Sequence, residues 1–153
     1  MRFLLGIAMF LVGMLVFHLI NAHWHLTTAV APFADAPTVM GFGIVISAVI
    51  VATGQANTFV SGIKAAFSKR HNLSEDERIR AIGLFKLLRK TVVYAAILFS
   101  SMTMVFILGN LQDWDTFAAN TALAMLSVYY AALINIILIN PVISILERRN
   151  EQK

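Results

Sequence analysis

Residues 78–108 read RIRAIGLFKLLRKTVVYAAILFSSMTMVFIL, and the change of character within this stretch decides the fold. Five Lys and Arg residues lie before Thr91, and none lies between Thr91 and Leu108. A run of 18 residues without charge is long enough to cross roughly 30 Å of hydrocarbon. The stretch therefore predicts a membrane span with a basic flank on its amino-terminal side.

Three further apolar runs have the same character. They cover residues 3–20, 38–53 and 118–139, and like 91–108 they contain no Asp, Glu, Lys or Arg. The twelve Lys and Arg residues fall only at Arg2, between Lys64 and Lys90, and from Arg148 onward. Basic and Lys-free sides thus alternate, which fixes orientation in a bilayer. We expect an all-α polytopic membrane protein with four transmembrane helices and both termini in the cytoplasm.

Composition excludes a soluble globular domain. Hydrophobic residues make up 59% of the 153 residues, charged residues only 13%, and the mean hydropathy is +0.77; such a chain would expose too much apolar surface in water. The net charge of +4 does not indicate nucleic acid, because the cations flank apolar runs. They are expected to meet anionic lipid headgroups. We expect residues 1–153 to form a single membrane domain.

The first run, residues 3–20, has a competing interpretation as a secretory signal peptide. The apolar core of a signal peptide usually has about 7–15 residues, and a small-residue cleavage site follows it. Here the run is longer, and Asn21, Ala22, His23 and Trp24 form no convincing site. We expect a retained helix.

Between the spans, we expect residues 64–90 to lie in the cytoplasm, together with the two termini. Ser74 and Glu77 have the spacing of a capping box, so a helix should begin there. Ile79, Ile82 and Phe85 would give this helix one apolar face. Two interpretations stay open: an amphipathic helix on the membrane surface, or a helix that continues unbroken into the span that begins at Thr91.

Few residues in the apolar runs can carry protons. His18 is the one titratable group of that kind, and an imidazole can exchange a proton near neutral pH. A lone His near a helix end more often hydrogen-bonds a neighbouring helix. His23, His25 and Asp35 could form a metal site, but two His beside Trp24 are more often polar anchors at the membrane interface, and we expect no metal or other cofactor.

Hydroxyl and amide side chains are concentrated in the last two runs. Uncharged oxygens can hold water or solvate a cation, although a single Ser or Thr usually bonds to its own helix. A pair that faces across two antiparallel helices would favour an ion path. The residues are Ser100, Ser101, Thr103, Thr121, Ser127, Tyr129, Tyr130, Asn135 and Asn140.

Four segments carry a resemblance to a known family. Phe33–Thr38 and Phe59–Phe67 flank the second run, while Leu108–Asp113 and Ala122–Tyr130 lead on to Asn140 and Pro141. The first pair resembles the second span and its cytoplasmic exit in MotA-type flagellar stator subunits. The second pair resembles the turn and last span of the MotA/TolQ/ExbB proton-channel family.

The resemblance implies a function in a bacterial cytoplasmic (inner) membrane. In that family, five four-span subunits surround two single-span partner helices of the MotB or ExbD kind, and the partner supplies a proton-carrying Asp. Hydroxyls of the last two spans line the path; the matching positions here are Ser100, Ser127 and Val128. We take Ser100, Ser127, Thr103, Thr121 and Tyr130 as candidate path residues. Arg78, Arg80 and Lys86 are the candidates for coupling to a driven target.

The chain departs from the family pattern at Val128, which has no hydroxyl, and in three further places. Phe99-Ser100 stands where Gly-Thr is expected, and Ile44-Val45-Ile46 stands where Gly-Gly-Thr is expected. The large cytoplasmic domain of MotA is replaced by about 20 residues. We therefore expect a short stator-like, ion-driven subunit that does not turn a flagellum, and the alternative is a non-conducting scaffold of the same architecture. No motif indicates an enzyme.

Overall fold

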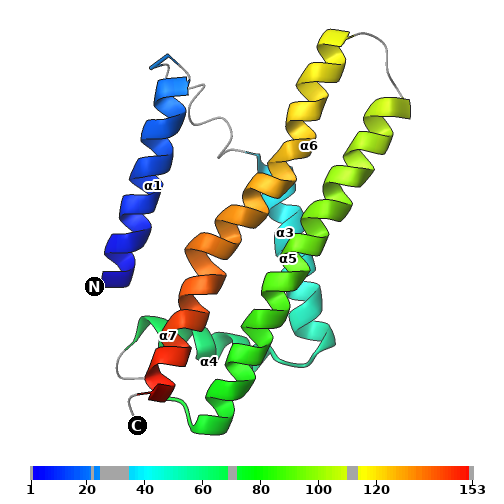
Figure 1. Cartoon of the computed structure of the whole chain (residues 1–153). Coiled ribbons are helices and arrows are strands. Elements are labelled where there is room, and N and C mark those ends of the chain that lie inside the picture. The colour runs from blue at the N-terminus through cyan, green and yellow to red at the C-terminus, as the bar shows by residue number, and fades with distance from the viewer. Residues whose placement is uncertain (1, 22, 25–34, 69–71, 110–113, 152–153) are drawn as a thin grey trace. The chain divides into compact units, whose positions relative to one another are not determined.

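The computed structural model describes residues 2–21, 23–24, 35–68, 72–109 and 114–151, and every regular element in these ranges is a helix. This confirms the all-α prediction (Figure 1). The elements are α1 Arg2–Asn21, α3 Ala36–Ala52, α4 Ala56–Phe67, α5 Glu75–Gly109, α6 Trp114–Ile134, the π-helical turn η2 Asn135–Ile139, and α7 Asn140–Glu151.

Two of the described helices are long and apolar enough to cross a membrane. They are Glu75–Gly109 and the continuous stretch Ala124–Arg149; a third span results if α3 and α4 count as one, although the two are bent by 115°. Leu5–Asn21 of α1 is apolar but shorter. These helices support a membrane protein. The four-span topology and the position of the termini stay predictions.

The chain divides into two compact units, Met1–Val39 and Met40–Lys153. The first contains α1, in which the Nδ1 atom of His18 lies 2.8 Å from the backbone carbonyl of Met14. The second contains the hydrophobic core, and the candidate path residues all belong to it.

Helix α5 begins at the predicted capping box. The backbone N–H of Ser74 donates to Oε2 of Glu77 at 2.9 Å, and the N–H of Glu77 donates to Oγ of Ser74 at 3.3 Å. Each side chain thereby satisfies a backbone donor that the first turn leaves open. The helix then runs unbroken to Gly109, so the continuous helix is confirmed over the separate surface helix.

The apolar face predicted for the start of α5 was partly wrong. Phe85 is fully buried and Ile82 is half-buried, but Ile79 is 56% exposed. The buried face of α5 is rotated by one residue from the predicted face. Arg78 and the small residue Ala81 face the neighbouring helices, and Ile79 does not. The buried residues of α5 are Arg78, Ala81, Leu84, Phe85, Leu88, Val92, Ala95, Ala96 and Ile107.

Helix α4 was not predicted as a separate element. The chain breaks after α3 because Gly54 adopts a φ of +64°, a conformation that a residue without Cβ adopts without strain. The N–H groups of Gly54 and Gln55 bond back to Val51 and Ile50 and close the end of α3. Helix α4 then packs against α5 and α7 (Figure 1).

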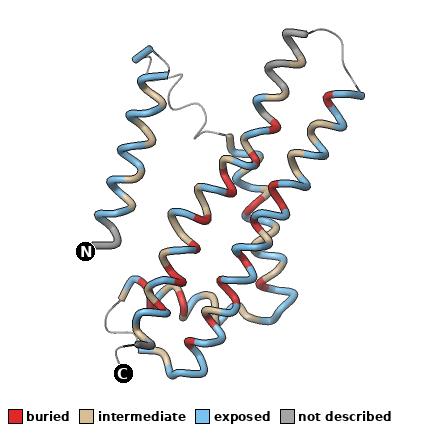
Figure 2. Tube along the Cα trace, viewed as in Figure 1, coloured by how far each residue is buried: buried red, intermediate tan, exposed pale blue. Residues whose placement is uncertain are grey.

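The core of the second unit is formed by α5, by the helix made of α6, η2 and α7, and by buried residues of α3 and α4. The first two of these helices run side by side, and their buried residues follow the facing sides (Figure 2). Leu88 and Val92 of α5 and Ile139, Val142 and Leu146 opposite are at most 2% exposed. Packing of these side chains therefore fixes which faces of the two helices meet.

The fourth apolar run was expected to end at about Ile139, but the helix continues to Glu151. Pro141 has no N–H, and in a regular α-helix its ring would clash with the carbonyl four residues earlier. The chain accommodates Pro141 with a π-helical turn, in which the N–H of Asn140 bonds to the carbonyl of Asn135, five residues back. A wider turn thus replaces the break that Pro141 would otherwise cause.

Candidate functional site

A line of hydroxyl groups follows the contact between α5 and α6, and one hydrogen bond sets its register. The hydroxyl of Ser100 on α5 donates to the backbone carbonyl of Ala124 on α6 at 2.6 Å. Ser127 lies one turn further along the same face of α6 and is 4% exposed. The two serines that the resemblance singles out therefore both belong to the α5–α6 contact.

The same register brings the two candidate threonines to one level. Because α5 and α6 are antiparallel, moving one turn beyond Ser100 along α5 reaches Thr103 and moving one turn back from Ala124 along α6 reaches Thr121. Both are half-buried. The hydroxyl of Thr121 donates to the carbonyl of Phe117 at 2.8 Å, within its own helix. Thr121 thus makes the local bond that is usual for membrane hydroxyls.

Tyr130 ends the line toward the basic part of the chain. It is 6% exposed and belongs to the hydrophobic core. Its ring meets that of Tyr129 edge-on, with the centroids 5.7 Å apart. Tyr130 is therefore held in place by packing, one turn from Ser127.

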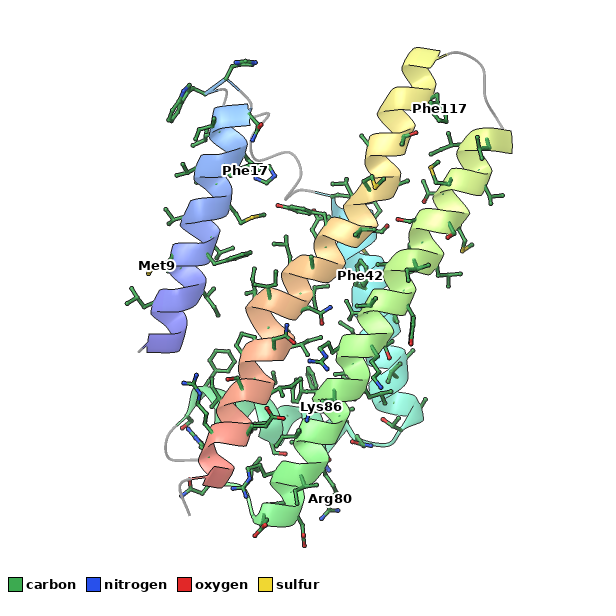
Figure 3. The ribbon with its side chains drawn as sticks, in the orientation of Figure 1. Met9, Phe17, Phe42, Arg80, Lys86 and Phe117 are labelled. Carbon is green, nitrogen blue, oxygen red and sulfur yellow. The ribbon has the colours of Figure 1, made fainter. Side chains whose placement is uncertain are left out.

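Phe99 closes the space beside Ser100 on the α3 side. Its ring lies edge-on to that of Phe42, with the centroids 5.5 Å apart, and a Cβ added to Gly41 would come within 3.3 Å of it. Phe42 is 1% exposed, and Figure 3 labels it on α3. The bulky residue that departs from the family pattern thus fills the contact between α3 and α5.

The chemistry available along this line is that of neutral oxygen atoms. Hydroxyls can accept a hydrogen bond from water or share a cation, but they do not store a proton at neutral pH. Among the described residues of α5 and α6 that line the contact, none is an Asp or a Glu. A proton carrier on this line would therefore have to come from another helix.

Neither family models nor curated proteins nor solved structures match this chain.

The three cations considered for coupling differ in their surroundings. Arg78 is 5% exposed and donates from Nη1 to the carbonyl of Arg149 at 3.4 Å. Lys86 forms an ion pair with Glu147 at 2.7 Å, and both side chains are about half exposed. Arg80 is exposed near the start of α5 (Figure 3), and its Nε donates to the carbonyl of Asp76 at 3.4 Å. Of the three, Arg80 is the one whose charge lies open to a partner.

The remaining candidates lie in the first unit. The Nδ1 atom of His18 lies 2.8 Å from the carbonyl of Met14 in its own helix. No group of three or more His, Cys, Asp and Glu side chains close enough to hold a metal ion occurs among the described residues. His25, from the proposed metal set, lies outside the described residues. A site at His23 and Asp35 therefore has no support from the described geometry.

Proposed function

We propose that the chain is a stator-like subunit of an ion-driven complex in a bacterial inner membrane. Several copies, five by analogy with the MotA/TolQ/ExbB family, surround single-span partner helices that carry the ion-binding Asp. Each copy has four spans and cytoplasmic termini. Protons, or another cation, pass along the partner helices, and the transmembrane potential supplies about 2.3 kcal/mol per charge per 100 mV.

One observation carries this proposal: a line of hydroxyls along the α5–α6 contact in apolar surroundings. Thr103, Ser100 and Ser127 follow one another at intervals of about one helical turn, with Thr121 level with Thr103. Hydroxyls held in this way can solvate a cation beside a carboxylate without the cost of a second buried charge. If the partner supplies the carboxylate and this chain the hydroxyls, the chain itself needs no acidic residue in its apolar runs, and it has none there.

A second function is favoured by a different observation. The Ser100 hydroxyl donates its hydrogen bond to the Ala124 carbonyl, so it has no second hydrogen to donate to an ion path. Phe99 fills the space toward α3. Both features suit a non-conducting scaffold in which the hydroxyls join helices. Such a scaffold would bind partner helices and move no ions.

Purification of the native complex in a mild detergent, through a tag on this chain, separates the two functions. The stator function requires a stoichiometric single-span protein with an Asp near the start of its helix, and a proton flux when the complex is placed in liposomes. A homo-oligomer without such a partner and without flux would favour the scaffold. A partner without flux would also favour the scaffold, because assembly alone does not require a path.

A further inference from the structure

A pocket lies where α5 passes η2 and the start of α7. Its volume is about 310 Å³. One wall comes from consecutive turns of α5 and the other from the π-helical region, where the wider turn separates two amide side chains by five residues. The lining residues are Arg89, Lys90, Val93, Tyr94, Asn135 and Asn140.

The charges around this pocket are unbalanced. Of the cations on this side of α5, Lys86 is neutralised by Glu147 at 2.7 Å. Arg89 and Lys90 are exposed, and no carboxylate of the described residues lies within ion-pair distance of either. The pocket therefore presents two positive charges without a counter-ion, which favours an anionic ligand.

The pocket also lies at a chemical boundary. Arg89 and Lys90 immediately precede Thr91–Leu108, the run without charge. Val93 and Tyr94 follow within one turn and are 44% and 68% exposed, so the pocket continues from cations to apolar surface. A molecule that fits this sequence of surfaces has an anionic head and an apolar chain.

Asn135 adds a polar group at the inner wall. The residue is 9% exposed, and its Oδ1 atom has no hydrogen-bond partner among the described residues. A buried amide oxygen without a donor is costly. Terminal amide torsions are broad, so a bound headgroup can draw this amide into a hydrogen bond.

We propose that this pocket binds the phosphate headgroup of an anionic glycerophospholipid. Arg89 and Lys90 hold the phosphodiester, Asn135 and Asn140 contact the polar part of the headgroup, and an acyl chain lies along Val93 and Tyr94. Basic pockets beside membrane helices bind acidic lipid headgroups in this manner. The site does not depend on ion conduction and would serve the scaffold equally well.

The test is a lipid titration of the purified, delipidated complex, followed by native mass spectrometry. Dioleoylphosphatidylglycerol is compared with dioleoylphosphatidylcholine, which has the same chains and no net charge. The wild type should prefer the anionic lipid by about tenfold or more, since each cation near an acidic headgroup contributes about a fivefold gain. Equal binding of the two lipids would overturn the proposal.

Two variants with equal charge loss locate the site. The double variant Arg89→Gln/Lys90→Gln should bind the anionic lipid about 30-fold more weakly. Lys64→Gln/Arg148→Gln removes the same charge from exposed positions on α4 and α7 and should stay within about twofold of the wild type. Equal losses in both variants would show general attraction to the protein surface and would contradict a defined pocket.

A third variant keeps every charge and fills the pocket. Val93→Trp should lower the affinity for the anionic lipid while Arg89 and Lys90 remain, and it stays informative if the charge variant fails to fold. Unchanged affinity would show that the pocket is not where the lipid binds. Excess inorganic phosphate should displace little lipid, because it lacks the apolar chain; full displacement would identify a simple phosphate site instead.

Discussion

Gly62 of α4 lies so close to Phe85 of α5 that a Cβ on the glycine would come within 2.8 Å of Cε2 of the ring. The same Cβ would lie 3.3 Å from Cβ of Ala81. Phe85 is fully buried, so its ring has little room to move aside. The absence of a side chain at this one position allows α4 to pack against the basic end of α5.

We expect Gly62→Ala to destabilise the protein by about 1–3 kcal/mol, the usual cost of overpacking a core. The measurement is the thermal unfolding of the detergent-solubilised protein. Gly83→Ala is the matched control, because a Cβ at Gly83 meets nothing within 4 Å in the described structure. This control should gain about 0.5–1 kcal/mol from the better helix propensity of Ala. A shift of the same sign in both variants would contradict the close packing.

We expect Ser100→Ala to weaken the α5–α6 contact through loss of the bond to Ala124. Hydrogen bonds between membrane helices contribute on average about 0.6 kcal/mol, so the free energy of unfolding should fall by about this amount. Thr121→Ala removes a hydroxyl whose bond stays within α6, and it should have a smaller effect. If Thr121→Ala proves the more harmful, the interhelical bond does not matter for stability.

The proposed ion path makes a separate demand on Ser127. Ser127→Ala removes the hydroxyl without adding bulk to a site that is only 4% exposed. Loss of a hydrogen bond to a charged species costs about 1.5–3 kcal/mol, so proton flux in liposomes should fall by about tenfold or more. Oligomer size, measured by gel filtration, should not change. Full flux in this variant would remove Ser127 from the path and favour the scaffold.

Arg80 and Arg78 should respond differently to charge reversal. Arg80→Glu changes an exposed side chain and should uncouple the driven target while flux persists, since its charge is open to a partner. Arg78→Glu places a carboxylate where the guanidinium is 5% exposed and contacts the Arg149 carbonyl. It should destabilise the fold by about 3–5 kcal/mol, because it leaves a buried charge unpaired. Flux and coupling assays on the two variants, together with unfolding curves, distinguish coupling from folding.

The helical character and the start of α5 could be predicted from the sequence because both depend on local chemistry. Uncharged runs form helices in an apolar environment, and the capping box at Ser74 and Glu77 acts within one turn. The exposure of Ile79 could not be predicted in this way. Its side chain is as apolar as that of Ile82, and which face of α5 is buried depends on how α4 and α7 pack against it.

The candidate path could likewise be predicted only in part from the sequence. The sequence showed that hydroxyls are concentrated in the last two runs but not which of them face each other; in the structure Ser100 bonds across to α6. It could not show that the acceptor is the Ala124 carbonyl, because the relative register of two helices depends on packing along their whole length. The continuation through Pro141 was missed for a similar reason, since Pro usually ends a helix and the π-helical turn becomes visible only in the backbone.

The π-helical turn also keeps the buried face of the last helix in line with α5. Ala131, Asn135 and Ile139 are buried at intervals of four residues, and in a regular α-helix each such interval would rotate the buried stripe by about 40°. The wider turn takes up this rotation, so that Val142 and Leu146 stay in the core and Glu147 still reaches Lys86. A residue that normally interrupts helices thus lets one helix keep its alignment with α5 over both the apolar and the basic half of the molecule.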